Sequence, residues 1–443
     1  MEKALILDIL NDWNFWSKDL ESGFVREDYL GRCLRYLEMD VVSALIGVRR
    51  SGKSFIMRQV IKRLIANGIE RRAVLFINFE DRRFTDFYSG LLDEIFDVYR
   101  EHVYPAGVPY VFLDEVHLLP GWERWVRSMH ELGKAKIVVS GSSSRLLSGE
   151  LATVLTGRHL DVHVFPLVFS EFLRFKNLLP RDALEEAGKK NDIKRALNEY
   201  IEYGGFPAVI LGSEKKELLL TYFEDILTKD IERRYGLKKA QILRSLARFY
   251  LTNISAPITY NSLSKNFDTT TNTVEKYSQF LVEANMVFFV KRFSYKTKEQ
   301  DKSPRKVYSI DVGLSNAVGF RLSPGMGRIA ENIVALELQE ESATNPGKEI
   351  YYWRDSDGRE VDFLLKSGTH VKQLIQVCWN LEDSQTKNRE ITGLVKASQV
   401  LKCNDCLIIT EEMEGCENIK GVPVKYVPLR KWLLKSNFEN NPR

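Results

Sequence analysis

The chain has few cysteines and little net charge. It contains 5 cysteines in 443 residues, too few for the disulfide framework that stabilises small secreted domains. The one closely spaced pair, Cys403 and Cys406, stands without a second pair or neighbouring histidines, so we expect reduced thiols rather than a zinc site. With 44% hydrophobic and 28% charged residues, the composition is that of a protein that folds around ordinary hydrophobic cores.

Long apolar runs are missing too. Glu2, Asp8 and Asp12 interrupt the apolar N-terminal stretch, which therefore lacks the continuous core of a signal peptide. No later apolar run reaches the length of about 20 residues that a membrane-spanning helix needs. We therefore expect a cytoplasmic protein without a membrane partner.

The formal net charge of +4 is concentrated in one segment. Residues 291–306, KRFSYKTKEQDKSPRK, contain seven lysines and arginines against two acidic residues, which gives +5 and leaves the rest of the chain about neutral. A basic segment of this kind is either a solvated loop or a contact for a polyanion, and its neighbours in the sequence decide between them.

A glycine-rich loop lies between an expected strand and an expected helix near the N-terminus. Residues 41–46, VVSALI, predict a buried strand, the apolar spacing that follows the loop predicts a helix, and residues 47–54 read GVRRSGKS. Backbone N–H groups of such a loop and the N-terminal end of the helix bind phosphate groups. We expect Lys53 to neutralise the β and γ phosphates of ATP and Ser54 to ligate Mg²⁺. The expected nucleotide contacts are Gly47, Val48, Arg49, Arg50, Ser51, Gly52, Lys53, Ser54 and Phe55.

Two adjacent carboxylates follow a second strand. Residues 110–113 predict a buried strand that delivers Asp114 and Glu115 at its carboxyl end, where ligands bind in open α/β sheets. Asp114 can hold Mg²⁺ through water, and Glu115 can polarise an attacking water. Together with the glycine-rich loop, this pair predicts an ATPase.

Two more segments predict buried strands with polar residues at their ends. They are residues 73–81, AVLFINFED, and residues 135–147, AKIVVSGSSSRLL. Repeated units of strand and helix predict a doubly wound parallel α/β sheet. Among the polar side chains at the strand ends, Ser142 is the candidate for sensing the γ phosphate and Asn78 for restraining Glu115. Ordinary turn chemistry is the alternative for each.

The motifs occur in an order that resembles one family. GVRRSGKS, FLDEVH, SGSSSRLLSGELATVLTGRH, YGGFP, YFEDILTKDI and KVYSIDVGLSNA together resemble archaeal and bacterial P-loop ATPases of the AAA+ class that end in a domain of unknown function, over about residues 10–435. The resemblance implies a homo-oligomer, a hexameric ring, in which an arginine of one subunit reaches the γ phosphate of the next. Arg158 is the candidate for this role, with a surface salt bridge as the alternative.

The same resemblance assigns YGGFP, residues 203–207, to the adenine pocket. Gly205 and Pro207 would then lie against the base. The alternative is that these two residues only mark the ends of helices.

Residues 255–293 predict a winged helix-turn-helix. A short helix, residues 258–267, is followed by a longer helix that starts at Asp268 and by a strand, residues 286–293. Short polar residues early on the longer helix would contact phosphates or base edges of DNA. These residues are Thr269, Thr270, Asn272, Thr273 and Lys276.

The basic segment follows this strand directly. Residues 305–311 return as the partner strand, so Lys296, Lys298 and Lys302 would lie at the tip of a hairpin, the wing. A basic wing beside a recognition helix is better explained by a phosphate backbone than by solubility. The alternative is a winged helix that serves only as a structural lid for the ATPase.

The C-terminal part resembles the restriction-endonuclease-like fold, whose junction-cleaving members are found in archaea. A helix with Glu331, a hairpin with Glu360 and Asp362, and the strand QLIQVCW correspond to its acidic elements. Active members carry an acidic residue and a lysine two positions apart on that strand, where this chain has Gln376 and Cys378. An amide binds Mg²⁺ more weakly than a carboxylate, and a thiol does not supply the charge of a lysine. We expect binding without cutting, with at most a weak metal site.

These interpretations divide the chain into five parts. They are an N-terminal segment, 1–35, the P-loop AAA+ core, 36–180, a helical lid or linker, 181–245, the winged helix, 246–325, and a restriction-endonuclease-like α/β domain, 326–443. The expected function is a Mg²⁺-dependent AAA+ ATPase that binds and remodels DNA, with branched DNA such as a Holliday junction indicated by analogy alone. The alternatives are a nucleotide-dependent switch that binds protein partners through its C-terminal domains, and a metal-dependent nuclease.

Overall fold

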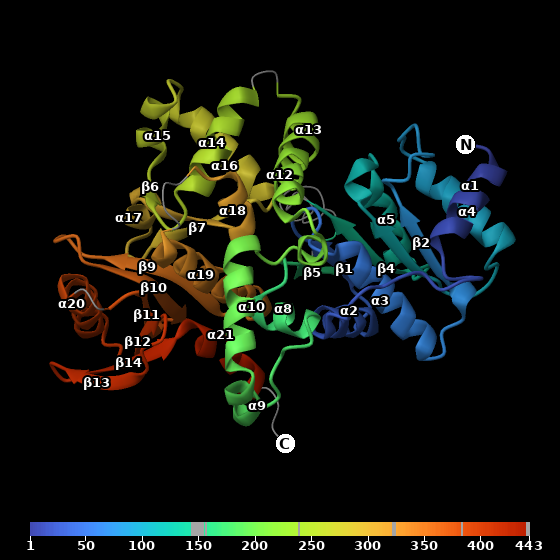
Figure 1. Cartoon of the computed structure of the whole chain (residues 1–443). Coiled ribbons are helices and arrows are strands. Elements are labelled where there is room, and N and C mark those ends of the chain that lie inside the picture. The colour runs from blue at the N-terminus through green and yellow to red at the C-terminus, as the bar shows by residue number, and fades with distance from the viewer. Residues whose placement is uncertain (143–154, 156, 238–239, 321–324, 382–383, 440–443) are drawn as a thin grey trace. The chain divides into compact units, whose positions relative to one another are not determined.

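The chain forms two compact units. The computed structural model describes residues 1–142, 155, 157–237, 240–320, 325–381 and 384–439 (Figure 1). The first unit consists of Met1–Val164 together with Glu283–Asn285, and the second unit contains the rest. Each unit has its own sheet and its own hydrophobic core.

The first unit is built on a parallel sheet. Its strands are β1 (Val42–Ile46), β2 (Val74–Asn78), β3 (Tyr110–Asp114), β4 (Lys136–Gly141) and β5 (His159–His163). Their order in the sheet is β2-β3-β4-β1-β5, and every neighbouring pair is parallel. All residues of β1 are buried, as expected for a parallel strand that is covered on both faces. The expected doubly wound α/β sheet is confirmed.

Helices cover both faces of this sheet (Figure 1). Ala44 and Ile46 of β1 join the core on one face, and Leu45 joins the core on the other, because successive side chains of a strand point to opposite sides. The first face is packed by α1 (Lys3–Trp13), α4 (Leu91–His102) and α5 (Trp122–Glu131). The second face is packed by α2 (Glu27–Glu38) and α3 (Lys53–Ala66). Two short 3₁₀ helices are η1 (Arg71–Ala73) and η2 (Val116–Leu118).

The second unit begins with a series of helices. They are α8 (Phe169–Phe175), α9 (Ala183–Gly188), α10 (Lys190–Tyr203), α11 (Pro207–Leu211), α12 (Lys215–Asp225), the π-helical η3 (Ile226–Glu232), α13 (Arg233–Tyr235) and α14 (Ala240–Thr252). Pro207 is the first residue of α11, where a missing N–H group costs nothing.

A group of helices and antiparallel strands follows. Its elements are β6 (Pro257–Ile258), α15 (Tyr260–Asn266), α16 (Thr271–Glu283), β7 (Val287–Arg292), α17 (Thr297–Lys302) and β8 (Arg305–Ser309). Strand β8 pairs with β7 on one side and with β6 on the other, both antiparallel. The expected order of short helix, longer helix and strand hairpin is therefore present, with α17 inserted between the two hairpin strands.

The expected start of the longer helix at Asp268 is wrong. Helix α16 begins at Thr271, because the Thr270 hydroxyl accepts a hydrogen bond of 3.1 Å from the Thr273 N–H group. Asp268 has φ of 47°, which lies outside helical geometry.

The C-terminal part completes a nine-stranded mixed sheet. The remaining elements are α18 (Val312–Val318), α19 (Met326–Thr344), β9 (Lys348–Arg354), β10 (Glu360–Ser367), β11 (His370–Val377), α20 (Ser384–Leu401), β12 (Cys406–Thr410), β13 (Gly415–Ile419), β14 (Val422–Pro428) and α21 (Leu429–Glu439). The strand order is β13-β14-β12-β11-β10-β9-β7-β8-β6. Strand β7 pairs in parallel with β9, so one sheet contains both the hairpin and the C-terminal strands.

None of the helices in the described segments combines the length and the apolar character that crossing a lipid bilayer requires.

Candidate functional site

The loop between β1 and α3 is shaped by two glycines. A Cβ atom on Gly47 would lie 2.1 Å from the carbonyl oxygen of Val164, so only glycine fits against the chain that follows β5. Gly52, which immediately precedes α3, has φ of 102°, a conformation that favours glycine. The loop thus keeps its backbone N–H groups uncovered by Cβ atoms at two points, as a phosphate cradle requires.

The first residue of α3, Lys53, turns back into this loop. Its ammonium is buried and donates hydrogen bonds of 3.0 Å and 3.2 Å to the carbonyl oxygens of Gly47 and Val48. It also forms an ion pair of 3.5 Å with the Glu115 carboxylate. A buried positive charge therefore lies beside the loop, compensated by one carboxylate and two backbone dipoles.

The second strand of the site presents its two carboxylates in different ways. Asp114 ends β3, and its carboxylate accepts a short hydrogen bond from the Ser140 hydroxyl of β4. The same hydroxyl accepts a bond of 3.0 Å from the Glu115 N–H group. Glu115 has φ of 52°, a left-handed conformation that turns it away from the strand. Its Oε2 lies 3.3 Å from Nδ1 of His117. Ser140 therefore fixes the end of β3 against β4.

The surroundings of Asp114 weaken its acidity. Burial, and then the neighbouring Glu115 carboxylate, raise the pKa of Asp114 to about 6, although hydrogen bonds from Ser140 and Ser54 and the charge of Lys53 lower it. A cation near this carboxylate would offset the cost of its buried charge. The hydrogen bond with Ser54 brings together the hydroxyl and the carboxylate that the sequence assigned to Mg²⁺.

Residues of the N-terminal segment are hydrogen-bonded to the loop and to α3. Arg26 is buried and donates a hydrogen bond of 3.1 Å to the carbonyl oxygen of Ser51, and Gln59 of α3 donates to the carbonyl oxygens of Ser22 and Phe24. The Ser51 hydroxyl is buried and has no hydrogen-bond partner among the described residues. An unsatisfied polar group at this position fits a loop that closes on a polar ligand.

The other expected nucleotide contacts lie in this loop and in the first turn of α3. Val48 is buried, and the buried Arg49 forms an ion pair with the exposed Glu80. Arg50 is exposed with φ of 70°, and Phe55 is partly exposed on α3. Their contacts with a nucleotide stay predictions.

The two candidates at the strand ends lie in different surroundings. Asn78 ends β2, and its side-chain oxygen accepts a hydrogen bond of 2.9 Å from the Glu80 N–H group, which is ordinary turn chemistry. Ser142 follows β4 directly and is buried. Their assigned roles stay predictions, and Ser143, which follows in the motif, lies outside the described residues.

Arg158 lies at the opposite end of the sheet from the loop. It immediately precedes β5, and β5 pairs with β1 so that His159 faces Val42 and His163 faces Ile46. Arg158 is therefore level with Val41, six residue steps of about 3.3 Å from Gly47 at the start of the loop, or about 20 Å along the strands. Its guanidinium forms a close ion pair with Glu131 at the end of α5.

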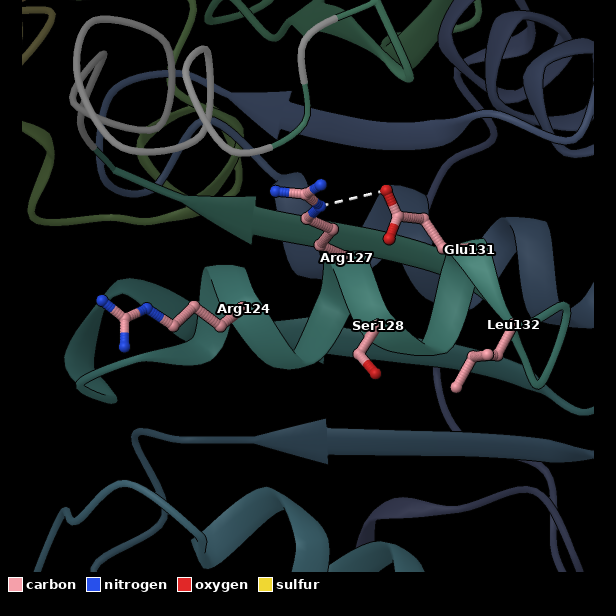
Figure 2. Close-up of a pocket in the computed structure, with 5 residues that line it drawn as sticks. All are labelled: Arg124, Arg127, Ser128, Glu131 and Leu132. Atoms are coloured by element: carbon pink, nitrogen blue, oxygen red, sulfur yellow. Dashed lines mark hydrogen bonds and ion pairs between the residues drawn. The ribbon is translucent and has the colours of Figure 1, made fainter.

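Glu131 also accepts a hydrogen bond from a second arginine. Figure 2 shows Arg127 of α5 donating to Glu131, at 3.0 Å, while Arg124 points away from this carboxylate. Both arginines line a pocket of about 430 Å³ along α5, together with Ser128, Glu131 and Leu132. Arg158 is thus held beside a basic surface of the first unit.

The YGGFP turn is tightly packed within the second unit. The Gly205 N–H group donates a hydrogen bond of 2.7 Å to Asp311, and a Cβ atom on Gly205 would lie 2.1 Å from the carbonyl oxygen of Leu167. Close packing accounts for this glycine without a ligand, and Pro207 begins α11. A role for either residue in an adenine pocket stays a prediction.

Exposed polar and basic side chains lie on α16 and at the hairpin tip. Asn272 and Lys276 are exposed on α16, whereas the hydroxyls of Thr270 and Thr273 hydrogen-bond to each other, and Thr269 is half-buried. At the hairpin tip, Lys296 forms an ion pair with Glu299, and Lys298 and Lys302 are exposed without an ion pair within the described segments. The solvent-accessible charge of the tip is therefore smaller than its sequence indicates.

The C-terminal candidates lie together on facing elements. Gln376 of β11 accepts a hydrogen bond of 3.1 Å from the Asp362 N–H group and donates one of 2.6 Å to Glu390. Cys378 follows β11 and is buried, and burial raises the pKa of its thiol to about 11. Neither side chain offers the negative or positive charge that phosphodiester cleavage would need at these positions.

Sequence reasoning missed two residues beside the candidate site, Arg26 at the loop and His117 at Glu115. No motif marks Arg26, which is buried against the loop only through folding of the N-terminal segment. His117 lies in the motif FLDEVH, where its spacing of two residues from Glu115 was the available signal.

Segments of the chain match three known domain families, and similar proteins and structures are known. Residues 40–173 match the family described as AAA domain, residues 194–324 match a domain of unknown function, DUF8612, and residues 326–432 match another, DUF4143. An uncharacterized protein of Haemophilus influenzae is 29% identical over 424 residues, which cover 93% of this chain and 98% of that protein. The structure of the Walker-type ATPase PABY2304 of Pyrococcus abyssi aligns with a TM-score of 0.42 at 16% identity, over 67% of this chain and 95% of that chain.

One relative is more similar over nearly its whole length. The uncharacterized protein MJ1544 of Methanocaldococcus jannaschii is 34% identical over 408 residues, which cover 89% of this chain and 88% of that protein. The chain therefore belongs to the family of MJ1544, and its residues 40–173, which match an AAA domain, form an AAA-type P-loop ATPase domain.

Proposed function

We propose that this protein binds ATP with Mg²⁺ in the loop between β1 and α3 and hydrolyses it to remodel DNA. The observation that carries the proposal is the position of Lys53, whose buried ammonium lies between the loop carbonyls and Glu115 in the AAA domain. An ammonium at this place is matched to the charge of a triphosphate.

The chain's own groups divide the chemistry between them. Backbone N–H groups of the loop and the N-terminal end of α3 would bind phosphate oxygens, and Lys53 would leave the loop carbonyls to neutralise them. Ser54 and Asp114, which hydrogen-bond to each other, would hold Mg²⁺, which supplies charge neutralisation at the phosphates when bound. Glu115 would orient and deprotonate the attacking water.

Arg158 would act on a neighbouring subunit. Its position at the opposite end of β5 from the loop keeps it away from the nucleotide of its own chain. A ring of identical subunits, a hexamer in the proposal, would bring this guanidinium to the γ phosphate of the next subunit once it leaves Glu131.

The second unit would contact DNA through α16 and the hairpin tip, in the manner of a winged helix. Asn272 and Lys276 would lie against the duplex, and Lys298 and Lys302 would contact phosphates from the hairpin. Two lysines without an ion pair in the described part of the chain, beside an exposed polar helix end, support contact with a polyanion more than with a protein partner. The likeness of the C-terminal elements to junction-binding folds makes branched DNA, such as a Holliday junction, the preferred substrate of the proposal.

Replacing Lys53 by alanine and Glu115 by glutamine should separate binding from turnover. We expect Lys53→Ala to weaken ATP binding at least about tenfold, because the charge that faces the phosphates is removed. Glu115→Gln should keep the dissociation constant for ATP while the rate of phosphate release falls about 100-fold or more. A fluorescent ATP analogue measures binding, and Lys134→Ala, an exposed lysine of the same unit, is the control. Equal loss of binding in both variants would contradict the assigned roles.

Arg158→Ala should abolish turnover and be rescued by a partner with an intact arginine. A chain with Lys53→Ala binds ATP too weakly to turn it over but still offers Arg158, so co-assembly of the two inactive variants should recover about one quarter of the wild-type rate if subunits mix at random. Differently tagged chains, co-expressed and purified through both tags, provide the sample. Glu131→Gln is the control, because it frees Arg158 and should retain activity. Wild-type turnover by Arg158→Ala, or no recovery in the mixture, contradicts action between subunits.

Reversing Lys296, Lys298 and Lys302 to glutamate should weaken DNA binding and reduce its dependence on salt. We expect the slope of log K against log salt to fall by about one unit for each phosphate that the hairpin no longer neutralises. Fluorescence anisotropy with a labelled duplex at several salt concentrations measures the slope. The control reverses three exposed lysines of the same unit elsewhere, Lys216, Lys420 and Lys425. An unchanged slope would remove the hairpin from the DNA interface and favour a protein-binding switch.

A further inference from the structure

A second buried lysine lies in the second unit, surrounded by carboxylates. The side chain of Lys306, on β8, is 2% exposed. Its ammonium lies 2.9 Å from Oε1 of Glu331 on α19, and 2.7 Å from Oε1 of Glu360 and from Oδ1 of Asp362 on β10. The ammonium thus donates hydrogen bonds to Glu331 and Asp362 and forms an ion pair with Glu360, so three acidic groups compensate its charge.

Burial and neighbouring charges shift the pKa values of the groups in this cluster. Burial, and then the charge of Asp362, raise the pKa of Glu331 to about 8, although the charge of Lys306 and hydrogen bonds from Lys306 and Tyr308 lower it. Burial alone would lower the pKa of Lys306, but Asp362 and Glu331 more than offset this, and the pKa lies well above its usual value. Tyr308 donates a further hydrogen bond of 2.7 Å to Glu331. The lysine is therefore charged, and its partners are arranged around that charge.

The same three carboxylates are those that the likeness to nuclease folds assigns to a divalent cation. A cation would need oxygens at about 2.0–2.6 Å, and would have to occupy nearly the position of the Lys306 ammonium. Gln376, where active members have a carboxylate, is engaged by Glu390 and the Asp362 N–H group instead. Within the described residues, no group of three histidine, cysteine or acidic side chains is arranged to hold a metal ion. The residues present therefore do not fit a metal.

We propose that Lys306 takes the place of a divalent cation in this carboxylate cluster, excludes metal from it, and fastens the β7–β8 hairpin to the C-terminal fold. Strands β8 and β10 are separated by β7 and β9 in the sheet, so the ammonium joins strands that are not hydrogen-bonded neighbours. The hairpin that carries the exposed Lys298 and Lys302 is thereby held to β10 and α19 through one charged group. A cluster with this role holds the hairpin in a fixed position relative to β10 and α19, and it does not hydrolyse phosphodiesters.

A fixed hairpin also follows from the contacts beside the cluster. Lys291 and Arg292 of β7 pair with Tyr351 and Tyr352 of β9, and the Arg292 side chain donates a bond of 3.0 Å to the carbonyl oxygen of Arg354. These bonds hold β7, the first strand of the hairpin, to β9, whereas the buried Lys306 side chain holds β8, the second strand. Removing the ammonium would leave the carboxylates to repel one another across buried space.

Removing the lysine should open a cation site. The full-length Lys306→Ala chain, without nucleotide, should bind one more Mn²⁺ per chain than the wild type, counted by electron paramagnetic resonance of free Mn²⁺. Its urea midpoint in EDTA should be lower than that of the wild type, and Mn²⁺ should restore at least half of the difference. Adding Asp362→Asn to Lys306→Ala should abolish both the extra ion and the restoration, which separates the cluster from any ion at Asp114.

Two results would overturn the proposal. One is a folded Lys306→Ala chain that binds no additional Mn²⁺. The other result concerns a variant that keeps Lys306. Glu360 is the most exposed of the three carboxylates, at 25%, and a Glu360→Gln chain should bind the same number of Mn²⁺ ions as the wild type. One ion fewer in that variant would show that the native cluster already holds metal. If Lys306→Ala does not fold in either buffer, the comparison of the wild type with Glu360→Gln decides. Equal numbers of bound Mn²⁺ ions in these two chains would support exclusion of metal by the lysine.

Discussion

The geometry of the candidate nucleotide site depends on one buried ion pair, between Lys53 and Glu115, at the carboxyl end of a parallel sheet. An ammonium and a carboxylate buried together cost several kcal/mol of desolvation, so the fold must supply compensating bonds. It does so by placing the ends of β1, β3 and β4 side by side: carbonyl oxygens of the loop accept from Lys53, and Ser140 holds the backbone of Glu115 in a left-handed conformation. Without the register of the sheet, these groups, which are distant in sequence, would not meet.

The two buried lysines, Lys53 and Lys306, show how surroundings set the use of the same charge. Lys53 has one carboxylate and two carbonyl oxygens as partners and lies beside a loop whose N–H groups suit an anion, so its charge is available to a phosphate. Lys306 is paired with three carboxylates, so its charge is already engaged within the fold. The first arrangement fits a cycle of ligand binding and release, and the second fits a permanent joint. In the proposed cycle, ATP would alter the first site while the second keeps the hairpin and the C-terminal fold moving as one body.

Local patterns in the sequence were sufficient for the sheet and the loop, and long-range pairing was not predictable from them. The strand before Gly47 and the strand before Asp114 are short apolar runs with polar residues at their ends, and both are present as expected. The start of α16 was misplaced because both Asp268 and Thr270 can cap a helix, and only the backbone conformation distinguishes them. The resemblance to nuclease folds had grouped Glu331, Glu360 and Asp362, but the lysine among them could not be foreseen, because Lys306 was read as part of a basic segment.

The central claim is that the first unit turns over ATP in the service of nucleic-acid remodelling. Steady-state phosphate release by the purified wild-type chain with Mg²⁺ tests it most directly, measured without nucleic acid and with duplex, single-stranded and four-way-junction DNA. The account predicts measurable release that DNA accelerates, with the junction at least as effective as the duplex. A folded chain that binds ATP yet releases no phosphate under any of the four conditions would contradict it.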